Sequence, residues 1–424
     1  MFCLNSAGGA LTLIAPALRL DELCIQSLAH SRCNKGKSPT SQISKHKDYK
    51  MRIGFLSHSD MSIYYFRLPI MRALKDAGHK VYAIMPKGAY EKRVGAEFEC
   101  VFYDIDGASI NPLRVGKNAL NLAKALAPLH LDMLQSAAHK SNVFGTMAAS
   151  MIGIKNIFCL VEGLGSAYTG DSLKHKILRF VLENLYKNTL NKAKACIFVS
   201  EADAKFFSEK KLCDKDKIKV IKSVGINCSL FAPSPELAAP ELEPLKGKKI
   251  VLMAARALVD KGVGEFYEAA DILSARKDCA FVFVGSPVKG KAGFSTEFLG
   301  SGANVFYLPW SDNIKALLNA SYIYALPSYA EGFPRTILEA MAMAKPCVAS
   351  KARGCNEAVC DGQTGLLCEV RSGADLAAKI SQLLDDENLA FNMGQKARQI
   401  AQSKYDESIV VKEYLELYKS FGIC

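Results

Sequence analysis

Residues 323–350, IYALPSYAEGFPRTILEAMAMAKPCVAS, contain the pattern that decides the fold. A short apolar run, Ile323–Leu326, ends in a loop with proline and glycine, and a helical segment follows at Pro334–Ala344. A second apolar run comes next, at Cys347–Ser350. Short apolar runs separated by helices are typical of buried parallel strands, whose connections cross over the sheet. The stretch therefore predicts a strand–loop–helix–strand unit of an α/β protein.

The same alternation continues in both directions from this unit. In the C-terminal half, further strands are predicted at Lys249–Ala254, Ala280–Gly285 and Asn304–Leu308, and further helices at Gly264–Lys277, Asn313–Ala320, Leu376–Asp385, Leu389–Gln402 and about Glu407–Phe421. In the N-terminal half, strands are predicted at Ile53–Ser57, Lys80–Met85, Val101–Asp104, Asp132–Gln135, Asn156–Val161, Ala195–Ser200 and Ile218–Lys222, and helices at Phe66–Ala77, Val115–Ala127 and Leu173–Asn191. Repeated alternation favours two doubly wound, Rossmann-like sheets that face a cleft.

A proline-rich segment separates the two halves. Residues 232–247, APSPELAAPELEPLKG, have little periodicity, which indicates a linker. We therefore predict a first domain over 51–235 and a second over 236–404. The final helix, 405–424, is expected to return to the first domain.

The first fifty residues do not share this pattern. No basic segment precedes their apolar start, which argues against a signal peptide. We interpret residues 1–50 as a poorly ordered extension or a wrongly assigned start, with Met51 as the natural first residue.

Composition narrows the class of protein. Of the 424 residues, 50% are hydrophobic and 23% charged, which excludes global disorder. The longest apolar stretch, Phe144–Leu160, is interrupted by Lys155, so no transmembrane helix is expected. The 14 cysteines form no Cys-x-x-Cys pair, which favours reduced thiols in a cytosol.

The net charge of +12 is concentrated in the first domain. Residues 51–240 carry 26 basic and 17 acidic side chains, so this half is expected to meet phosphate or an anionic membrane surface. No arginine-rich tract or aromatic-basic RNA signature accompanies the charge, which argues against nucleic acid as a partner.

The loop and helix after Ile323–Leu326 hold the strongest candidate site. Glu331 lies in the loop, Pro334 is expected at the first helical position, and Glu339 lies further along the helix. The start of a helix attracts phosphate, and two flanking carboxylates can bind two groups of hydroxyls. A nucleotide sugar fits that description, although two solvated glutamates are the plain alternative.

Two further clusters follow predicted strands at the same kind of edge. Arg256 and Lys261 come after Lys249–Ala254, where their cations can neutralise a diphosphate. His139 follows a strand of the first domain, from which it can reach a donor sugar. Ordinary solvated charges and a structural histidine are the alternatives.

A basic amphipathic segment, Ser172–Ala195, lies in the first domain. It carries Lys174, Lys176 and Arg179 among leucine, isoleucine and phenylalanine residues, a composition that suits an anionic membrane or a helix packed on the core. The cluster Tyr64-Tyr65-Phe66-Arg67 is a second candidate for membrane or acceptor contact.

The sequence favours neither a metal nor a dinucleotide. Asp104-Ile-Asp106 spells a short metal-binding string, but Arg256 and Lys261 would make a metal unnecessary at a diphosphate. Each partial Gly-x-Gly-x-x-Gly pattern lacks its third glycine, so an NAD enzyme is not expected.

Several of these motifs resemble those of a known family. Glu331-Gly-Phe-Pro with Glu339, Arg256…Lys261-Gly and Gly225-Ile-Asn are similar to motifs of the retaining GT-B glycosyltransferases of the glycogen-synthase-like family 4. The resemblance covers about Met51 to Phe421. Longer strings resemble the group in that family that transfers N-acetylgalactosamine to undecaprenyl-diphospho-diacetylbacillosamine in bacterial protein N-glycosylation; they are SHSDMSIYYFRLPIMRALKDAG, QSAAHKSNVFG, VEGLGSAY, IKSVGIN, MAARALVDKGVGEFYE and LPSYAEGFPRTILEA.

The resemblance implies a retaining hexosyltransferase with the GT-B fold. Its donor would be UDP-N-acetylgalactosamine and its acceptor a sugar on undecaprenyl diphosphate, joined in α-1,3 linkage without a metal or other cofactor. The enzyme would sit peripherally on the cytoplasmic face of the inner membrane, and the basic first domain would take the lipid-linked acceptor.

The resemblance also implies roles for individual residues. Arg256 and Lys261 would hold the UDP diphosphate, and Glu339 the ribose hydroxyls. Glu331 and the backbone of Gly332, Phe333 and Pro334 would hold the donor sugar, and His139 would contact it near the reacting carbon. The leaving phosphate would help to deprotonate the acceptor hydroxyl. In place of the glycine-rich loop of many members, this chain has Ser57-His58-Ser59-Asp60, so that loop's donor contacts are not carried over.

Three alternatives stay open from the sequence. The same fold serves sugar-nucleotide epimerases, which need no acceptor. A family 4 transferase can also act on another lipid-linked or lipopolysaccharide acceptor. A non-enzymatic scaffold on the membrane surface would use only the basic amphipathic segment.

Overall fold

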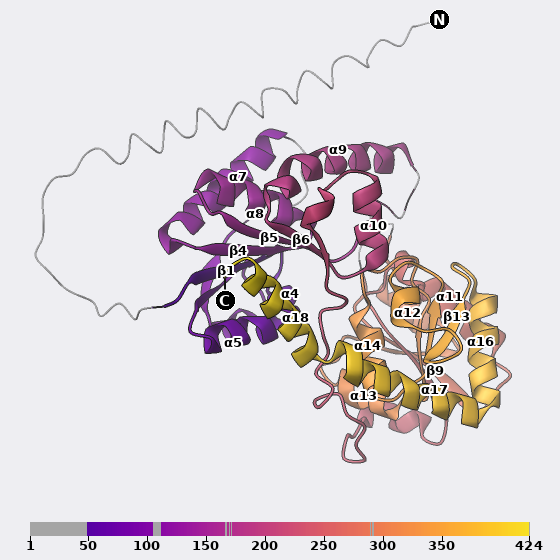
Figure 1. Ribbon diagram of the computed structural model, residues 1–424. Coiled ribbons are helices and arrows are strands. Elements are labelled where there is room, and N and C mark those ends of the chain that lie inside the picture. The colour runs from indigo at the N-terminus through magenta and orange to yellow at the C-terminus, as the bar shows by residue number, and fades with distance from the viewer. Residues whose placement is uncertain are drawn as a thin grey trace, which may run out of the picture.

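The structure, a computed structural model, describes residues 49–104, 112–165, 168, 170, 172–288, 290 and 292–423. Two parallel sheets, each covered by helices, form an N-terminal and a C-terminal lobe (Figure 1). The extension predicted over residues 1–50 lies outside the described residues except for its last two. Asp106 of the Asp-Ile-Asp string lies outside them as well.

The N-terminal lobe is built on a seven-stranded sheet with the order β3-β2-β1-β4-β5-β6-β7. Its strands are β1 (Arg52–Ser57), β2 (Lys80–Met85), β3 (Glu99–Phe102), β4 (Met133–Ala137), β5 (Asn156–Val161), β6 (Ala195–Phe198) and β7 (Ile218–Val220). Its helices are α4 (Asp60–Phe66), α5 (Leu68–Asp76), α6 (Glu91–Gly95), α7 (Pro112–Leu126), α8 (His139–Met151), α9 (Leu173–Thr189) and α10 (Glu201–Glu209).

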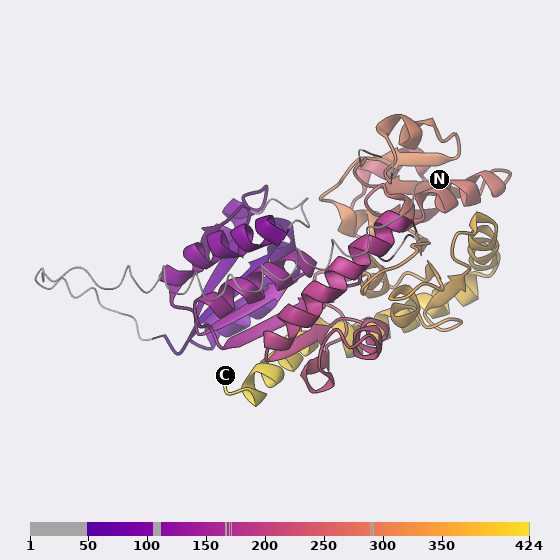
Figure 2. The ribbon, with the colours of Figure 1, turned by 90° about the horizontal axis from the view of Figure 1, so that it is seen from above.

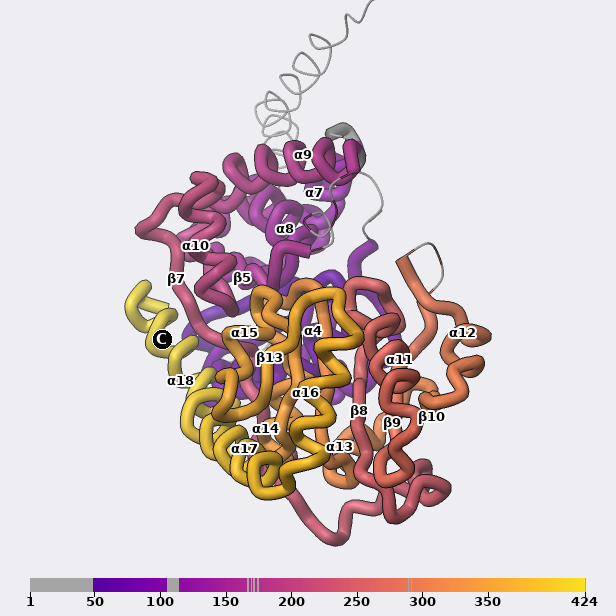
Figure 3. The backbone as a smooth tube through the Cα atoms, turned by 90° about the vertical axis from the view of Figure 1, so that its right-hand side faces the viewer, coloured from indigo at the N-terminus to yellow at the C-terminus, as the bar shows by residue number. Residues whose placement is uncertain are grey.

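The C-terminal lobe has a six-stranded sheet with the order β10-β9-β8-β11-β12-β13. Its strands are β8 (Lys249–Ala254), β9 (Cys279–Val284), β10 (Val305–Leu308), β11 (Ile323–Leu326), β12 (Cys347–Ser350) and β13 (Gly365–Cys368). Its helices are α11 (Val263–Ile272), α12 (Thr296–Ser301), α13 (Ile314–Ala320), α14 (Arg335–Ala342), α15 (Cys355–Ala358), α16 (Gly373–Asp385) and α17 (Glu387–Ile400), and α16 packs on β12 and β13 (Figure 3).

Both sheets are entirely parallel, and in both the strand order reverses next to the first strand. The reversal falls between β1 and β4 in one sheet and between β8 and β11 in the other. This is the doubly wound arrangement, in which ligands bind at the carboxyl ends of the strands beside the reversal. The predicted α/β class with two Rossmann-like sheets is confirmed.

The chain crosses between the lobes twice, and the two crossings pair with each other. Ile226 donates its backbone N–H to the carbonyl of Tyr405 at 2.9 Å, and Glu407 donates to the carbonyl of Ile226 at 2.9 Å. Gly225 next to them has a φ of 78°, and a Cβ there would lie 2.9 Å from the Cα of Glu407. The crossings therefore touch backbone to backbone.

The last helix, α18 (Glu407–Ser420), lies against the N-terminal lobe (Figure 2). It contacts α5, and the ring of Tyr418 packs edge-on against Phe158 of β5 with centroids 5.2 Å apart. The hydroxyl of Tyr418 donates to the side-chain oxygen of Gln135 in β4. The C-terminal segment thus contributes to the core of the first lobe.

The structure departs from the sequence prediction in a few elements. The helix predicted at Phe66–Ala77 is α5, which begins at Leu68 with a proline in its first turn, and the separate helix α4 before it was not predicted. Helices α6, α8, α10, α12 and α15 and strand β13 were not predicted either. The segment predicted as a linker contains a 3₁₀ helix, Pro240–Leu245, whose Leu242 is buried.

Candidate functional site

The candidate site residues lie where the carboxyl edges of the two sheets meet. The loop after β5 and the loop after β11 touch through glycines. A Cβ on Gly332 would lie 1.9 Å from the carbonyl oxygen of Glu162, and one on Gly163 would lie 3.2 Å from the Cα of Gly332. Any larger residue at Gly332 would force the loops apart. The short distance between the two loops therefore depends on glycine at this position.

Lys261 and Glu331 form an ion pair within the C-terminal lobe. Lys261 ends a short turn after β8, and Glu331 lies in the loop after β11. The Nζ of Lys261 is 2.6 Å from Oε1 of Glu331, and the two side chains are only 17% and 15% exposed. A partly buried charge-assisted hydrogen bond of this kind fixes both side chains. The structure therefore brings together two predicted donor-binding residues.

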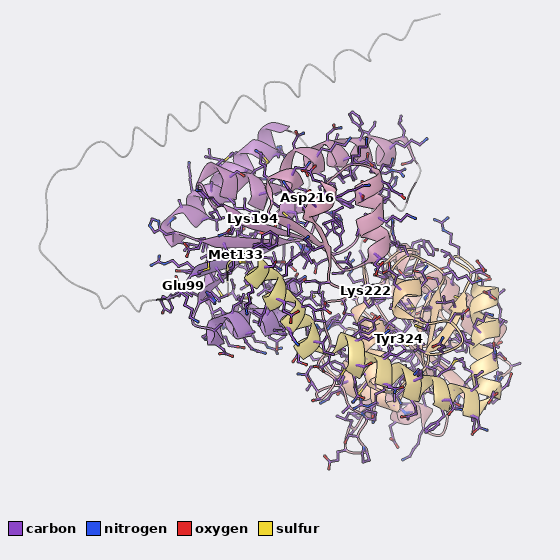
Figure 4. The ribbon with its side chains drawn as sticks, in the orientation of Figure 1. Glu99, Met133, Lys194, Asp216, Lys222 and Tyr324 are labelled. Carbon is purple, nitrogen blue, oxygen red and sulfur yellow. The ribbon has the colours of Figure 1, made fainter. Side chains whose placement is uncertain are left out.

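The same two loops are held by backbone packing on both sides of that pair. Gly262 has a φ of 75°, and a Cβ there would lie 2.1 Å from the carbonyl oxygen of Pro327. Beneath the loops, Tyr324 of β11 (labelled in Figure 4) donates its hydroxyl to the carbonyl of Ala254 at the end of β8, at 3.1 Å. These contacts hold the loop that carries Lys261 in one position.

Glu339 is buried in α14 rather than solvated. It is 8% exposed, and its carboxylate accepts from Nε of Arg335 at 3.0 Å. Burial raises the pKa of Glu339, and the cation of Arg335 opposes that rise. The helix begins at Arg335, one residue later than predicted, with Pro334 as its extended cap. Arg335 also donates to the carbonyl of Tyr65 in the other lobe.

His139 is the first residue of α8, directly after β4. The preceding Ala138 has a φ of 71°, and this turn lets the chain enter the helix at once. The ring Nδ1 is hydrogen-bonded to the hydroxyl of Tyr186 from α9, and Nε2 faces Gly165, where a Cβ would lie 2.9 Å away. Burial lowers the pKa of His139 to about 4, so its imidazole is neutral near pH 7.

Charges from both lobes surround His58, which follows β1. Burial of its ring lowers the pKa of His58, and the carboxylate of Glu162 opposes this shift. The cations of Lys140, Arg256 and Arg67 lower the pKa further. Arg256 belongs to the C-terminal lobe and its side chain is exposed. The residues after β1, β4 and β8 therefore act on one another electrostatically across the junction of the lobes.

Arg67 lies inside the molecule, and the tyrosines near it are only partly buried. Arg67 is 2% exposed and forms an ion pair with Glu162, which leaves it no surface for a membrane. Tyr64 and Tyr65 are half-buried against Tyr90, with the rings of Tyr64 and Tyr90 stacked 4.9 Å apart. The cluster is joined to the site through the pair of Arg67 and Glu162.

The remaining predicted residues are placed as follows. Phe333 is buried against Tyr405, with ring centroids 5.2 Å apart, so only its backbone faces the loop. On α9, Lys176 is exposed, and Arg179 is half-buried and donates to the carbonyl of Gly170 at 2.9 Å. The side chain of Lys174 lies outside the described part of the chain.

Two general features of the described residues bear on the site. They contain no group of three or more His, Cys, Asp or Glu side chains that would hold a metal ion. None of their helices has both the length and the apolar character needed to cross a bilayer.

A hollow of about 620 Å³ between α11 and α12 is lined by Tyr267, Phe298 and Asp271, and no predicted site residue lines it.

Sequence reasoning gave no role to four residues that the structure places in this site. His58 and Glu162 each follow a predicted strand. Their roles were not predicted, because the residues that surround them are distant in sequence. Arg335 is four residues before Glu339, a spacing that signals a helical ion pair. Tyr186 carried no signal, because its contact with His139 is tertiary.

Comparison with known proteins agrees with this architecture. A family model described as "Glycosyl transferases group 1" matches residues 236–400. The chain is 45% identical, over 87% of its length and 98% of the relative, to the N,N'-diacetylbacillosaminyl-diphospho-undecaprenol α-1,3-N-acetylgalactosaminyltransferase of Campylobacter jejuni. It is 25% identical, over 66% of its length and 73% of the relative, to the UDP-Gal:α-D-GlcNAc-diphosphoundecaprenol α-1,3-galactosyltransferase of Escherichia coli.

Solved structures give the same fold. Anabaena HepE, in complex with UDP and glucose, superimposes with a TM-score of 0.72 at 20% identity and covers 87% of this chain and 100% of its own. Sucrose-phosphate synthase of Thermosynechococcus elongatus superimposes with a TM-score of 0.72 at 18% identity and covers 88% of this chain and 99% of its own. Two parallel-sheet lobes with their site at the facing edges are the GT-B fold, and the protein is a glycosyltransferase. The chain belongs to the group 1 glycosyl transferases.

Proposed function

We propose that the protein transfers N-acetylgalactosamine from UDP-N-acetylgalactosamine, in α-1,3 linkage, to undecaprenyl-diphospho-N,N'-diacetylbacillosamine in bacterial protein N-glycosylation. The observation that carries this proposal is the 45% identity, over 98% of its length, to the Campylobacter jejuni enzyme. The lipid-linked acceptor in the name of the Escherichia coli relative supports the same substrate class.

The geometry of the C-terminal lobe supports a role in binding the donor. Lys261 and Arg256 bring cations to the carboxyl end of β8, where a diphosphate would be neutralised. Glu339 is a buried acceptor for ribose hydroxyls, and Glu331 with the Gly332–Pro334 backbone would bind the sugar. We propose that the reaction is metal-independent, because Lys261 and Arg256 can neutralise the diphosphate without a metal ion.

The reaction follows from these positions. The bond between the anomeric carbon and the phosphate oxygen breaks, and Lys261 and Arg256 stabilise the charge that develops on the leaving diphosphate. The acceptor hydroxyl oxygen bonds to the same face of that carbon, and its proton passes to the leaving phosphate. The neutral His139 ring positions the donor sugar by hydrogen bonding.

A lipid-linked acceptor requires the protein to work at a membrane surface. We propose that it binds peripherally to the cytoplasmic face of the inner membrane. The excess of basic over acidic side chains in residues 51–240 supports contact with anionic phosphate groups.

The test is a donor screen with one synthetic prenyl-diphospho-diacetylbacillosamine acceptor. We expect the acceptor to gain one N-acetylhexosamine from UDP-N-acetylgalactosamine in the presence of EDTA, with little product from UDP-N-acetylglucosamine or UDP-galactose. Proton NMR of the product reports the anomeric configuration. Conversion of the donor without acceptor would instead indicate an epimerase, and no transfer to any prenyl-diphosphate sugar would refute the proposal.

A further inference from the structure

Helix α9 exposes an apolar stripe on its outer face. Leu173, Ile177 and Phe180 are 73%, 52% and 59% exposed. They are spaced by four and three residues, which places them on one side of the helix. The helix runs along the upper side of the molecule, where Figures 1 and 2 show no other described element above it.

Basic side chains border this stripe. Lys176 and Lys187 are exposed on the same helix, and successive helical positions of 100° place both of them along one edge of the stripe. The acidic residue of α9, Glu183, lies near the same edge, but it is half-buried and accepts from the hydroxyl of Tyr168 at 3.4 Å. An apolar face edged by lysines on a helix lying at the surface matches the interfacial layer of an anionic bilayer.

We propose that the stripe of Leu173, Ile177 and Phe180, with Lys176 and Lys187, docks the enzyme on an anionic membrane surface. The apolar side chains would insert at the boundary of headgroups and acyl chains, while the lysines would meet lipid phosphates. A second copy of the chain fits less well, because a stable interface buries about 800 Å² on each partner and three side chains fall short of that.

The opposite face of the same helix reaches the candidate site. Tyr186 of α9 is fully buried and is hydrogen-bonded to His139. A helix with its side chains is about 10–12 Å across, so docking by the outer face would hold His139 roughly one helix diameter from the lipid. This part of the inference rests on the proposed function, because it gives α9 the task of bringing the site to a membrane-anchored acceptor.

Vesicle flotation tests the docking without any acceptor. The probes are vesicles of phosphatidylcholine alone and of phosphatidylcholine with phosphatidylglycerol, both free of prenyl lipids. We expect binding to the anionic vesicles, weakened by salt, and at least tenfold weaker binding of the triple variant Leu173→Ser, Ile177→Ser, Phe180→Ser. Lys176→Glu with Lys187→Glu should also weaken binding to anionic vesicles.

Matched controls come from the C-terminal lobe, where Ile272 and Phe391 are 51% and 65% exposed. The variant Ile272→Ser, Phe391→Ser should bind vesicles as the wild type does. All replaced apolar side chains are exposed, so thermal midpoints should stay within a few degrees of the wild type. Unchanged vesicle binding by the triple variant, or an equal loss in the control, would overturn the proposal, as would a dimer that the triple variant abolishes.

Turnover separates this inference from the proposed function. The triple variant should keep wild-type turnover of a water-soluble, short-prenyl acceptor and lose turnover of the full-length acceptor in vesicles. If the wild type fails on both acceptors but still binds anionic vesicles, the proposed function is wrong and the docking surface stands.

Discussion

At the scale of single residues, the Lys261–Glu331 pair is central to the proposed chemistry. The Nζ of Lys261 lies 2.6 Å from Oε1 of Glu331, and this ion pair restricts the movement of the lysine side chain. Replacing Lys261 by Ala removes one of the two cations proposed to stabilise the leaving diphosphate and is expected to lower turnover roughly tenfold or more. Steady-state kinetics with UDP-N-acetylgalactosamine measures the loss. Lys205→Ala, which removes a 77% exposed lysine, is the control, and normal turnover in Lys261→Ala would rule out a role at the diphosphate.

His139 gives a pH-dependent prediction at the same scale. Its pKa is about 4 in the folded protein, against 6.5 for a free histidine, so below pH 6.5 the unfolded chain binds a proton that the folded chain does not. Stability contributed by a neutral His139 is therefore present above pH 6.5 and is lost as the pH falls towards 4.

The variant His139→Gln should show a smaller drop in its urea midpoint between pH 7 and pH 5 than the wild type. His130→Gln replaces an exposed histidine outside the site and should show the same drop as the wild type. A drop in His139→Gln as large as in the wild type would show that the ring is not kept neutral by burial.

Which residues could be predicted depended on how local their surroundings are. Glu331, Lys261 and His139 follow apolar strands, so their placement at the carboxyl edge of a sheet was visible in the sequence. The burial of Arg67 was not, because it depends on Glu162, which lies 95 residues away. An isolated arginine beside tyrosines looks the same in a sequence whether it faces lipid or a buried carboxylate.

At the scale of elements, the contact between the loops after β5 and β11 depends on Gly332. Its Cβ position lies 1.9 Å from a backbone oxygen that cannot rotate away. Gly332→Ala is therefore expected to destabilise the fold by about 1–3 kcal/mol and to lower turnover as well, because the loops that carry Glu162 and Glu331 must separate.

Chemical unfolding and steady-state kinetics check this prediction. Gly300→Ala is the matched control, because nothing lies within 4 Å of its Cβ position in α12. Equal stability and activity of the two alanine variants would mean that the loops can yield without consequence.

Elements were predictable where their burial is one-sided or their apolar run is long. Helix α8 was missed because residues from Ser141 to Ala149 are buried almost all round, which removes the helical period from the sequence. Strand β13 was missed because its short run, Gly365–Cys368, begins with glycine, a residue that is depleted in strands. The strand order, which creates the two reversals beside the site, depends on pairing between distant segments and has no local signal.

At the scale of the whole molecule, the lobes are joined by the paired crossings and by a carboxylate that caps a helix across the junction. Glu357 of α15 accepts from the backbone N–H of Glu201 at 3.0 Å and of Ala202 at 3.1 Å, and from the hydroxyl of Ser200 at 2.6 Å. A carboxylate at a helix start is favoured by the helix dipole. Next to it, the fully buried Asp203 faces Arg353 of the C-terminal lobe at 3.1 Å.

This arrangement predicts that catalysis and donor binding can be separated by one substitution. Glu357→Ala leaves Ser200 as the N-cap of α10 but removes the carboxylate that accepts from the first two N–H groups of the helix, at a cost of about 1 kcal/mol, and so weakens one contact between the lobes. The cations and carboxylates proposed to hold UDP all lie in the C-terminal lobe, so calorimetry should find the UDP affinity unchanged. Turnover should fall severalfold, because His139 lies in the other lobe.

Small-angle X-ray scattering should find a larger radius of gyration for Glu357→Ala, since one of the contacts between the lobes is then lost. Glu369→Ala is the control, because Glu369 is 61% exposed and pairs with Lys351 within its own lobe. An unchanged radius with full turnover would mean that the glycine contact and the crossings alone set the distance between the lobes. A loss of UDP affinity would mean instead that residues of the N-terminal lobe bind the nucleotide, and that the cap acts on donor binding as well as on transfer.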